Sequence, residues 1–502
     1  MLQPFALFLS GLLMIGCFLL APMHSSAAVS GGGGNVDLSA LIDLLREKGV
    51  LSADEAVMLQ KRSVVEVPAA EIREERAPVR AVESADGSVR LTSSPAPATQ
   101  AAPAQPAIKL PDWLNRIKIG GDIRLRYQGD YFDEGNFESF PDPNDLDSII
   151  NTTEDRQRFR YRARISLAAQ VTDELKAAFR LATGNDDDPI STNDTLGDTF
   201  NKDSVLFDQA YLEWRPIPLL SVTGGRIPNP WFSTDLIWDK DLNFEGLALT
   251  YRQQYLDWLG AFATVGAFPI QEIERSEKDK WLYGGQVGIN VGRHDLVRFN
   301  MAAAYYHFTH TEGRQQTDPL GGDTSLEEDA SPRSLQLDNT PILNLGGDSI
   351  VGLAADFHEL DILATLDIAL WDPIHLVFLG EYVKNIGYDK EEVDERSGFE
   401  FFEGDQDMGY MFGAAIGHEK VDDLGRWNVY GYYRYIEADA VLSSFTDSDF
   451  HLGGTNSKGW VAGAEFGLMK NTWLSAKWQS SDEIEREQLG VDTLQVDLNA
   501  KF

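Results

Sequence analysis

The stretch from Arg156 to Gly184 constrains the fold more than any other part of this chain of 502 residues. In its first half, apolar residues alternate with basic or polar ones, so an extended chain would carry the two kinds on opposite faces. After a short turn at 171–174, a second strand repeats the alternation. The hairpin is long for a soluble sheet, whose strands usually have about 5–6 residues. Its apolar face must therefore pack against either a protein core or lipid.

The same alternation continues from residue 117 to residue 502, and we expect about sixteen strands. They are predicted at 117–128, within the hairpin at 156–184, and at 204–214, 219–226, 242–252, 256–267, 280–291, 296–309, 358–371, 374–386, 406–418, 425–436, 457–468, 472–480 and 491–502. Long and short connections alternate between them, as in an up-and-down barrel with one end in the periplasm and the other outside. A soluble sandwich would have shorter strands, and a propeller would repeat similar blades. The sequence therefore predicts an all-β fold, a transmembrane antiparallel β-barrel over residues 117–502 whose apolar face meets lipid.

The last strand ends on an aromatic residue, Phe502. An alternating strand that closes on a terminal aromatic resembles the C-terminal signature of bacterial outer-membrane barrels. The resemblance implies that Phe502 is part of a signal that the barrel-assembly machinery recognises. Further aromatic residues, Tyr432 and Trp473 among them, lie near predicted strand ends, where we expect them at the membrane interfaces.

Three segments precede the predicted barrel. Residues 1–28 are predicted to be a signal peptide, because an apolar run is followed by small residues at a cleavage site. The only cysteine, Cys17, lies in a loose lipobox, so a lipidated alternative stays open. Residues 29–62 predict a periplasmic helical hairpin, which either packs on neighbouring structure or acts as an oligomerisation or envelope-binding module. Residues 63–116 are a charged and Pro/Ala-rich linker.

Three sequence blocks resemble a known family. They are LIDLLREKGVLSADEA at 41–56, FDQAYLEWRP at 207–216 and GGRIPNPWFSTDLIWDKDLNFEGLAL at 224–249. The chain is similar to bacterial porins that carry a short helical segment ahead of the barrel, and the resemblance covers nearly the whole mature chain. It implies a Gram-negative outer-membrane diffusion channel. The expected partners are the lipid bilayer and small hydrophilic solutes, and the acidic loop at 185–198 leads to the hypothesis that it bridges lipopolysaccharide through divalent ions. General porins are often trimers, so a homotrimer stays open.

Basic side chains gather on the polar face of three neighbouring predicted strands. The predicted pore-lining residues are Arg124, Arg126, Arg158, Arg160, Arg162, Arg164, Lys176 and Arg180. Charged residues on the lipid face would cost roughly 2–4 kcal/mol each near the midplane, so this face should look into the lumen. There it would either lower the barrier for anions such as phosphate-like or carboxylate solutes, or align zwitterionic solutes. The alternative is a structural wall whose arginines pair with acidic loops or lipid headgroups.

The third long connection, residues 227–241, is too apolar for a freely solvated loop. Trp231 and Trp238 should pack either inside the barrel or over its rim. In general porins the corresponding loop folds inward and narrows the channel. We expect this arrangement here, with Asp235, Asp239 and Asp241 facing the arginines across a constriction.

The composition excludes several other functions. The formal net charge of −36 argues against a nucleic-acid partner, which calls for basic patches. The eight histidines are scattered, and the acidic residues of 185–198 do not match a calcium-binding EF-hand loop. No nucleophile–base set is visible, so we expect no enzyme, no cofactor and no metal site. The leading hypothesis is a porin for passive diffusion and ion transport. The alternative is a structural or adhesin barrel that the helical segment tethers to the envelope.

Overall fold

A computed structural model describes residues 116–138, 141–142, 145–149, 151–185, 188–272, 278–293, 295–312, 339–343 and 350–502. The chain divides into two compact units, Met1–Gln105 and Pro106–Phe502, and the described residues all belong to the second. The predicted signal peptide, the helical hairpin and all of the linker except its last residue lie outside the described residues.

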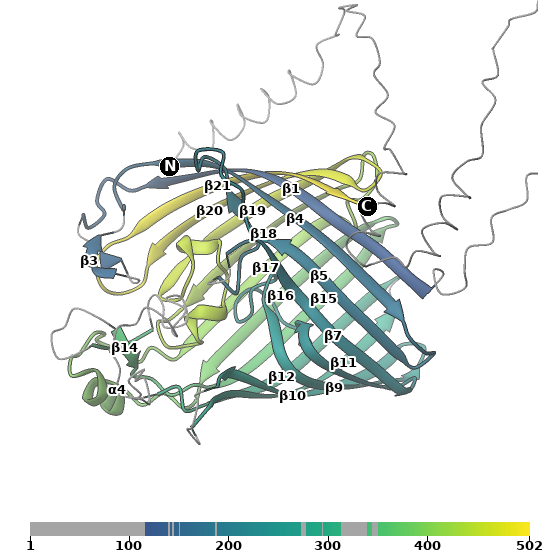
Figure 1. Cartoon of the computed structure of the whole chain (residues 1–502), viewed down its shortest axis with the longest axis horizontal. Helices are drawn as coiled ribbons and strands as arrows, with labels where there is room; N and C mark the ends of the chain where they lie inside the picture. Colours follow the sequence, from purple (N-terminus) through teal and green to yellow (C-terminus); the bar gives the residue numbers. More distant parts are fainter. Residues whose placement is uncertain are drawn as a thin grey trace, which may run out of the picture. The chain divides into compact units, whose positions relative to one another are not determined.

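Sixteen long antiparallel strands of the described residues form one closed ring (Figure 1). They are β1 (Ile117–Phe132), β4 (Arg156–Gln170), β5 (Leu175–Thr183), β7 (Val205–Ile217), β8 (Leu220–Pro228), β9 (Asn243–Leu256), β10 (Leu259–Gln271), β11 (Lys280–Arg293), β12 (Val297–Thr309), β15 (His358–Trp371), β16 (Ile374–Asn385), β17 (Met408–His418), β18 (Trp427–Ile436), β19 (Ser457–Met469), β20 (Thr472–Glu483) and β21 (Gly490–Lys501). Each pairs with the next along the chain, and β21 pairs with β1 to close the barrel. The predicted fold class is therefore confirmed.

Small elements lie in the longer connections. They are β2 (Pro141–Asp142), β3 (Asp145–Ile149), β6 (Asp194–Thr195), β13 (Pro341–Leu343), β14 (Ile350–Leu353), α4 (Lys390–Ser397), η3 (Ser443–Phe445) and η4 (Phe450–Leu452). Within the described residues, no helix has the length and apolarity that crossing a membrane requires.

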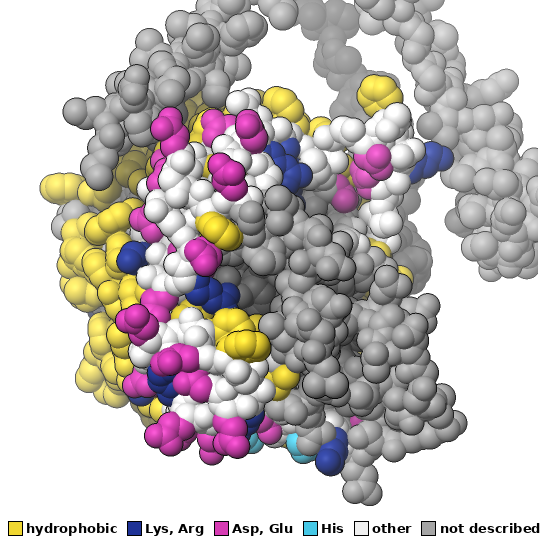
Figure 2. Space-filling view, turned by 90° about the vertical axis from the view of Figure 1, so that its left-hand side faces the viewer, with side chains coloured by type: hydrophobic (Ala, Val, Ile, Leu, Met, Phe, Trp, Pro, Cys, Tyr) yellow, Lys and Arg dark blue, Asp and Glu magenta, His cyan; other side chains and the backbone are white. Residues whose placement is uncertain are grey.

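Short and long connections alternate around the ring, as the sequence predicts. Short turns such as 171–174 and 257–258 lie at one end, whereas the elements of the long connections lie at the other, where β3, β14 and α4 are labelled in Figure 1. Figure 2 shows this second end, at which acidic and basic side chains gather while hydrophobic side chains cover the flank. In bacterial barrels the short turns face the periplasm.

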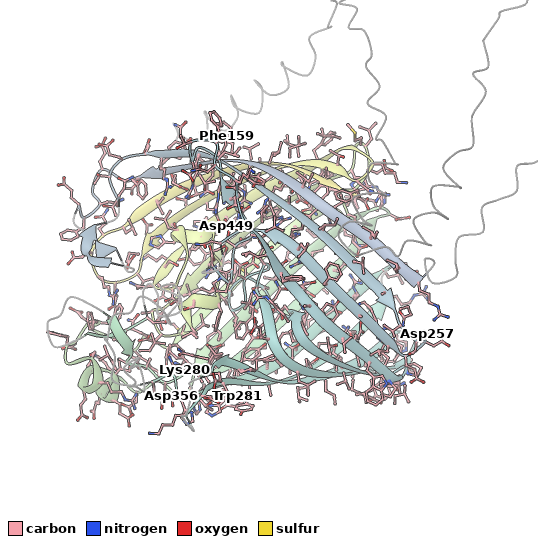
Figure 3. The ribbon with its side chains drawn as sticks, viewed as in Figure 1. Phe159, Asp257, Lys280, Trp281, Asp356 and Asp449 are labelled. Carbon is pink, nitrogen blue, oxygen red and sulfur yellow. The ribbon has the colours of Figure 1, made fainter. Side chains whose placement is uncertain are left out.

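The two faces of the wall differ as the alternation predicts. On the outer face, Ile119 is 67% and Phe159 is 62% exposed, whereas Arg124 on the inner face is only 5% exposed. Figure 3 shows Phe159 on the outer surface and Asp449 within the barrel. Because the exposed outer band is apolar, it is the surface that meets lipid.

The last residue completes the ring. The backbone N–H of Phe502 donates to the carbonyl of Gly121 at 3.0 Å, and the N–H of Gly121 donates back to the Phe502 carbonyl at 3.1 Å. The Phe502 side chain is exposed on the outer face. The start of β1 and the end of β21 therefore lie next to each other, at the short-turn end of the barrel.

Candidate functional site

The third long connection, residues 229–242, folds into the barrel. Trp231 packs edge-on against Tyr306 of β12, with ring centroids 5.2 Å apart, and Trp238 packs against the same ring at 5.1 Å. Phe244 of β9 lies 5.0 Å from Trp238. Leu236 is fully buried in the same cluster. The apolar residues that made a solvated loop implausible therefore anchor this loop to the inner wall.

Polar contacts fix the middle of this loop and its last turn to opposite parts of the wall. The Thr234 backbone N–H donates to Glu381 on β16 at 3.3 Å, and its hydroxyl also donates to that carboxylate. Near the C-terminal end of the loop, Asp241 accepts from Arg164 on β4 at 3.0 Å. These contacts and the aromatic cluster hold the loop across the lumen.

A second connection, residues 437–456 between β18 and β19, also folds inward, which we did not predict from the sequence. It pairs with the first loop through backbone groups, since the N–H of Asp239 donates to the carbonyl of Phe445 at 2.8 Å. The Thr446 hydroxyl donates to the carbonyl of Leu236 at 2.8 Å. The only hint in the sequence is the apolar run around Val441, which is unusual for an exposed loop and is fully buried.

Asp449 of the second loop is the main electrostatic link to the arginine wall. It accepts from Arg126 at 3.0 Å, and it lies 3.3 Å from the Lys477 ammonium and 3.5 Å from that of Lys240. Burial acts to raise the pKa of this carboxyl, but the three cations outweigh it and hold the pKa well below the ordinary value. The second loop is therefore docked by a carboxylate that stays ionised.

A third segment, residues 188–195, covers part of the same wall. The side-chain oxygen of Asn193 accepts a hydrogen bond from Arg124. The short strand β6 extends the sheet beside β4, where Thr195 pairs with Arg160. Three connections thus meet at the inner face of β1 and β4.

Most of the predicted pore-lining cations lie on the inner face but are paired with carboxylates. The ion pairs are Arg126 with Asp449 and Asp497, Arg158 with Asp130, Arg162 and Arg164 with both Asp122 and Asp241, Lys176 with Glu213, and Arg180 with Asp208. Among the described residues, Arg124 and Arg160 form no ion pair. Arg160 is partly exposed and has one long hydrogen bond to Gln128, of 3.4 Å. The arginine row is therefore not a uniform cationic surface.

The three predicted loop carboxylates do not all face the arginines. Only Asp241 does, and its pKa is lowered because Arg162 and Arg164 outweigh its burial. Asp239 instead accepts backbone N–H bonds within the loops, and burial raises its pKa. Asp235 lies 3.8 Å from the ammonium of Lys240. This differs from our expectation, because Asp239 is hydrogen-bonded to Ser448 of the second loop and Asp235 lies beside Lys240 of its own loop.

The wall of β15 to β18 has a different character. Glu359, Asp361 and Glu381 are buried on its inner face, so acidic groups lie on this part of the barrel. Beside them is a cavity of 300 Å³ lined partly by Tyr430 and Tyr432. Tyr432 therefore faces the lumen, so its predicted position at the membrane interface is wrong.

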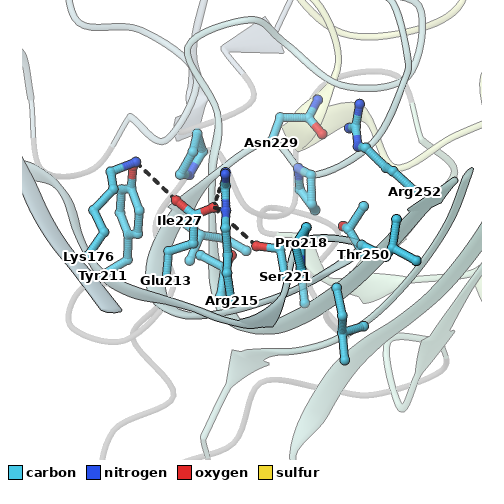
Figure 4. A pocket seen from close by; sticks show the side chains of 16 residues that line it. Lys176, Tyr211, Glu213, Arg215, Pro218, Ser221, Ile227, Asn229, Thr250 and Arg252 are labelled. Carbon is cyan, nitrogen blue, oxygen red and sulfur yellow. Dashed lines mark hydrogen bonds and ion pairs between the residues drawn. The ribbon is translucent and has the colours of Figure 1, made fainter. Parts of the chain in front are cut away.

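A larger cavity, of 480 Å³, lies towards the short-turn end of the barrel, and the first residues of the 229–242 loop line part of it (Figure 4). Its polar lining includes Lys176, Glu213, Arg215 and Arg252. Of these, only Lys176 was among the predicted pore-lining residues. Arg215 and Arg252 lie next to short turns, where a sequence pattern does not distinguish an inward side chain from a solvated one.

Within the described part of the chain, no group of three or more His, Cys, Asp or Glu residues is placed to hold a metal ion. The charged groups inside the barrel are instead joined in ion pairs and hydrogen bonds that fix the loops. Such an arrangement can filter solutes by size and charge.

Comparison with known proteins gives one family match, to the family described as "Putative porin", over residues 37–502. No curated protein matches the chain. Among solved structures, the chain is similar to OprB of Pseudomonas putida, with 11% identity, a TM-score of 0.46, and coverage of 78% of this chain and 96% of that one. It is also similar to OmpT of Vibrio cholerae lacking loop L8, with 11% identity, a TM-score of 0.41, and coverage of 77% and 99%. A third similar structure is the outer-membrane channel DcaP of Acinetobacter baumannii, with 12% identity, a TM-score of 0.39, and coverage of 77% and 97%.

Proposed function

We propose, since the chain belongs to the "Putative porin" family, that its barrel is a water-filled channel for the passive diffusion of small hydrophilic solutes, with a preference for anions. Membership of this family makes the protein an outer-membrane channel protein, and it favours a channel over an enzyme. The solute class, the ion preference and the role of each residue are part of the proposal.

The observation that carries the proposal is the division of charge between the two faces of the barrel wall. The outer band is apolar, whereas the inner face of β1, β4 and β5 carries a row of cations. Ionic groups on the inner face keep the lumen hydrated and interact electrostatically with charged solutes as they pass through the channel. The two inward loops support a narrowed passage, because they join across the lumen.

An anion preference is supported by the cations that lack a carboxylate partner. Arg124 and Arg160 form no ion pair among the described residues, and Arg160 is partly exposed to the lumen. Paired arginines contribute little net field, because each neighbouring carboxylate cancels a charge. The preference should therefore depend on these two members of the row.

Proteoliposomes test the passage of solutes. Liposomes that contain the purified, folded protein should swell in isotonic solutions of small sugars and faster in those of small organic anions, whereas protein-free liposomes should not swell. An absence of swelling would favour the structural or adhesin barrel. Recognition of Phe502 by the assembly machinery, binding of lipopolysaccharide and formation of a homotrimer remain predictions.

A further inference from the structure

We propose that the 480 Å³ cavity at the short-turn end of the lumen is a binding subsite for small hydroxylated organic anions, such as sugar acids. The inference deepens the proposed function and rests on it, because the cavity opens into the lumen of a diffusion channel. Its volume lies within the range of about 300–1,000 Å³ that is usual for small-molecule sites. Four strands form its wall, β5, β7, β8 and β9, and the start of the first inward loop covers it.

The charge of the cavity favours an anion. Three cations line it, Lys176, Arg215 and Arg252, against a single carboxylate, Glu213. Lys176 and Arg215 both pair with Glu213, at 3.0 Å and 2.5 Å. Arg252 forms no ion pair among the described residues, and its guanidinium lies over the ring of Phe262, 5.7 Å from the centroid. The lining therefore carries two positive charges that no carboxylate balances.

Glu213 orders one side of the cavity. Its carboxylate accepts from the Lys176 ammonium, from the Arg215 guanidinium and, at 3.1 Å, from the Ser221 hydroxyl. Arg215 is thereby held in one position while 64% of its side chain stays exposed. Figure 4 shows Arg252 on the opposite side of the cavity from Lys176 and Glu213. A bound solute would therefore meet preorganised donors on one side and an uncompensated guanidinium on the other.

Neutral polar groups line the rest of the cavity and indicate hydroxyl groups on the solute. Thr223 and Thr250 contribute hydroxyls, and Asn229 an amide. The Thr223 hydroxyl makes no hydrogen bond with the described residues, so it is available to a ligand. Sites built to bond a solute hydroxyl discriminate strongly against analogues that lack it, because the polar groups of the site are then left unpaired. Carboxylate and hydroxyl groups together fit this lining better than either alone.

Saturation-transfer NMR on the full-length protein folded in detergent tests the subsite directly. Gluconate should bind more tightly than glucose, which has hydroxyls but no charge, and more tightly than propionate, which has charge but no hydroxyls. Arg252→Gln should weaken gluconate binding by roughly fivefold or more, as expected for the loss of one charge close to an anion. Thr223→Val should weaken gluconate binding while propionate binding stays unchanged.

The matched control is Arg293→Gln. Arg293 lies at the same end of the barrel, ends β11, and pairs with Asp295 outside the cavity, so the variant should bind gluconate as the natural chain does. The subsite proposal would be overturned if gluconate bound no more tightly than glucose or than propionate. It would also be overturned if Arg252→Gln left the affinity for gluconate unchanged. Because this measurement needs no ion current, the same preparation can then be placed in a bilayer. Conducting channels without gluconate binding would refute only the subsite, and gluconate binding without conduction would refute only the channel.

Discussion

Substitutions of two arginines on the same strand should change two different properties of the protein. Arg160 and Arg162 both point inward from β4, two residues apart. Arg160 has no carboxylate partner among the described residues, whereas Arg162 lies 2.9 Å from Asp122 and 3.5 Å from Asp241. We therefore expect Arg160→Gln to change ion selectivity and Arg162→Gln to change stability.

For Arg160→Gln, the size of the effect follows from the loss of one uncompensated charge. A unit charge about 4 Å from a passing ion is worth about 1 kcal/mol in water, or roughly a fivefold change in local anion concentration. At about 0.1 M salt the Debye length is about 10 Å, so screening does not remove the effect. The reversal potential in a potassium chloride gradient should move towards cations. The free energy of unfolding should change by less than about 0.5 kcal/mol, because only one long hydrogen bond is lost.

For Arg162→Gln, the loss falls on two carboxylates that remain inside the barrel. Breaking a buried ion pair costs about 3–5 kcal/mol when the remaining charge has no other partner. Here Arg164 still pairs with both Asp122 and Asp241, so we expect a loss of about 2 kcal/mol in the free energy of unfolding. Denaturant unfolding in detergent, followed by circular dichroism, measures it.

A variant at an exposed ion pair is the control for both substitutions. Arg426→Gln removes a cation from an exposed pair with Asp422 at a short turn, and it should alter neither property. If Arg160→Gln leaves the reversal potential unchanged, the unpaired arginines do not set selectivity. If Arg162→Gln shifts selectivity as strongly as Arg160→Gln, the distinction between paired and unpaired members of the row is wrong.

Three further predictions concern the loops and the last strand. Trp238→Ala should lower the free energy of unfolding by about 3–5 kcal/mol, because it removes the ring buried against Tyr306, and a loss below about 1 kcal/mol would contradict the packing. The pKa of Asp449 is depressed, so its contribution to loop docking is complete above the ordinary aspartate pKa of about 3.9 and is lost as the pH falls through the depressed value. Docking should therefore weaken progressively below about pH 3.9, so current noise should rise as the pH is lowered from about 6 to about 2, and traces that stay identical over this range would show that Asp449 does not hold the loop. Deletion of Phe502 should reduce the amount of barrel in outer-membrane fractions, and an undiminished amount would remove its role in assembly.

The fold could be predicted because the period-two pattern is local. Each strand carries its own alternation, and a slip of one residue would place charges in lipid, so the pattern fixes which face points outward. The boundaries at the short turns were close, as in β15 and β16. β1 was predicted to end at 128 but extends to Phe132, because the paired strand β21 continues alongside it. Strand ends follow from the partner strand, which local sequence does not reveal.

The candidate site could be predicted only in part, because its geometry depends on contacts distant in sequence. The alternation in the sequence predicted that Arg126 and Arg162 point into the barrel. Their partners Asp449 and Asp241 lie on loops whose conformation depends on contacts with the barrel wall. The fold of residues 437–456 into the lumen has almost no local signature, since its hydrogen bonds go to a loop about 200 residues earlier in the chain. Sequence patterns therefore predicted the wall, the first loop and the position of Asp241 beside the arginines, but not the second loop and its pairing of Asp449 with Arg126.

A planar-bilayer recording tests the central claim most directly. Purified, folded protein added to one side of a lipid bilayer in potassium chloride should insert as discrete current steps of similar size, because each closed barrel would be one water-filled path. Folded protein that inserts into the bilayer without producing any current steps would contradict a channel and would leave the barrel as a structural element of the outer membrane.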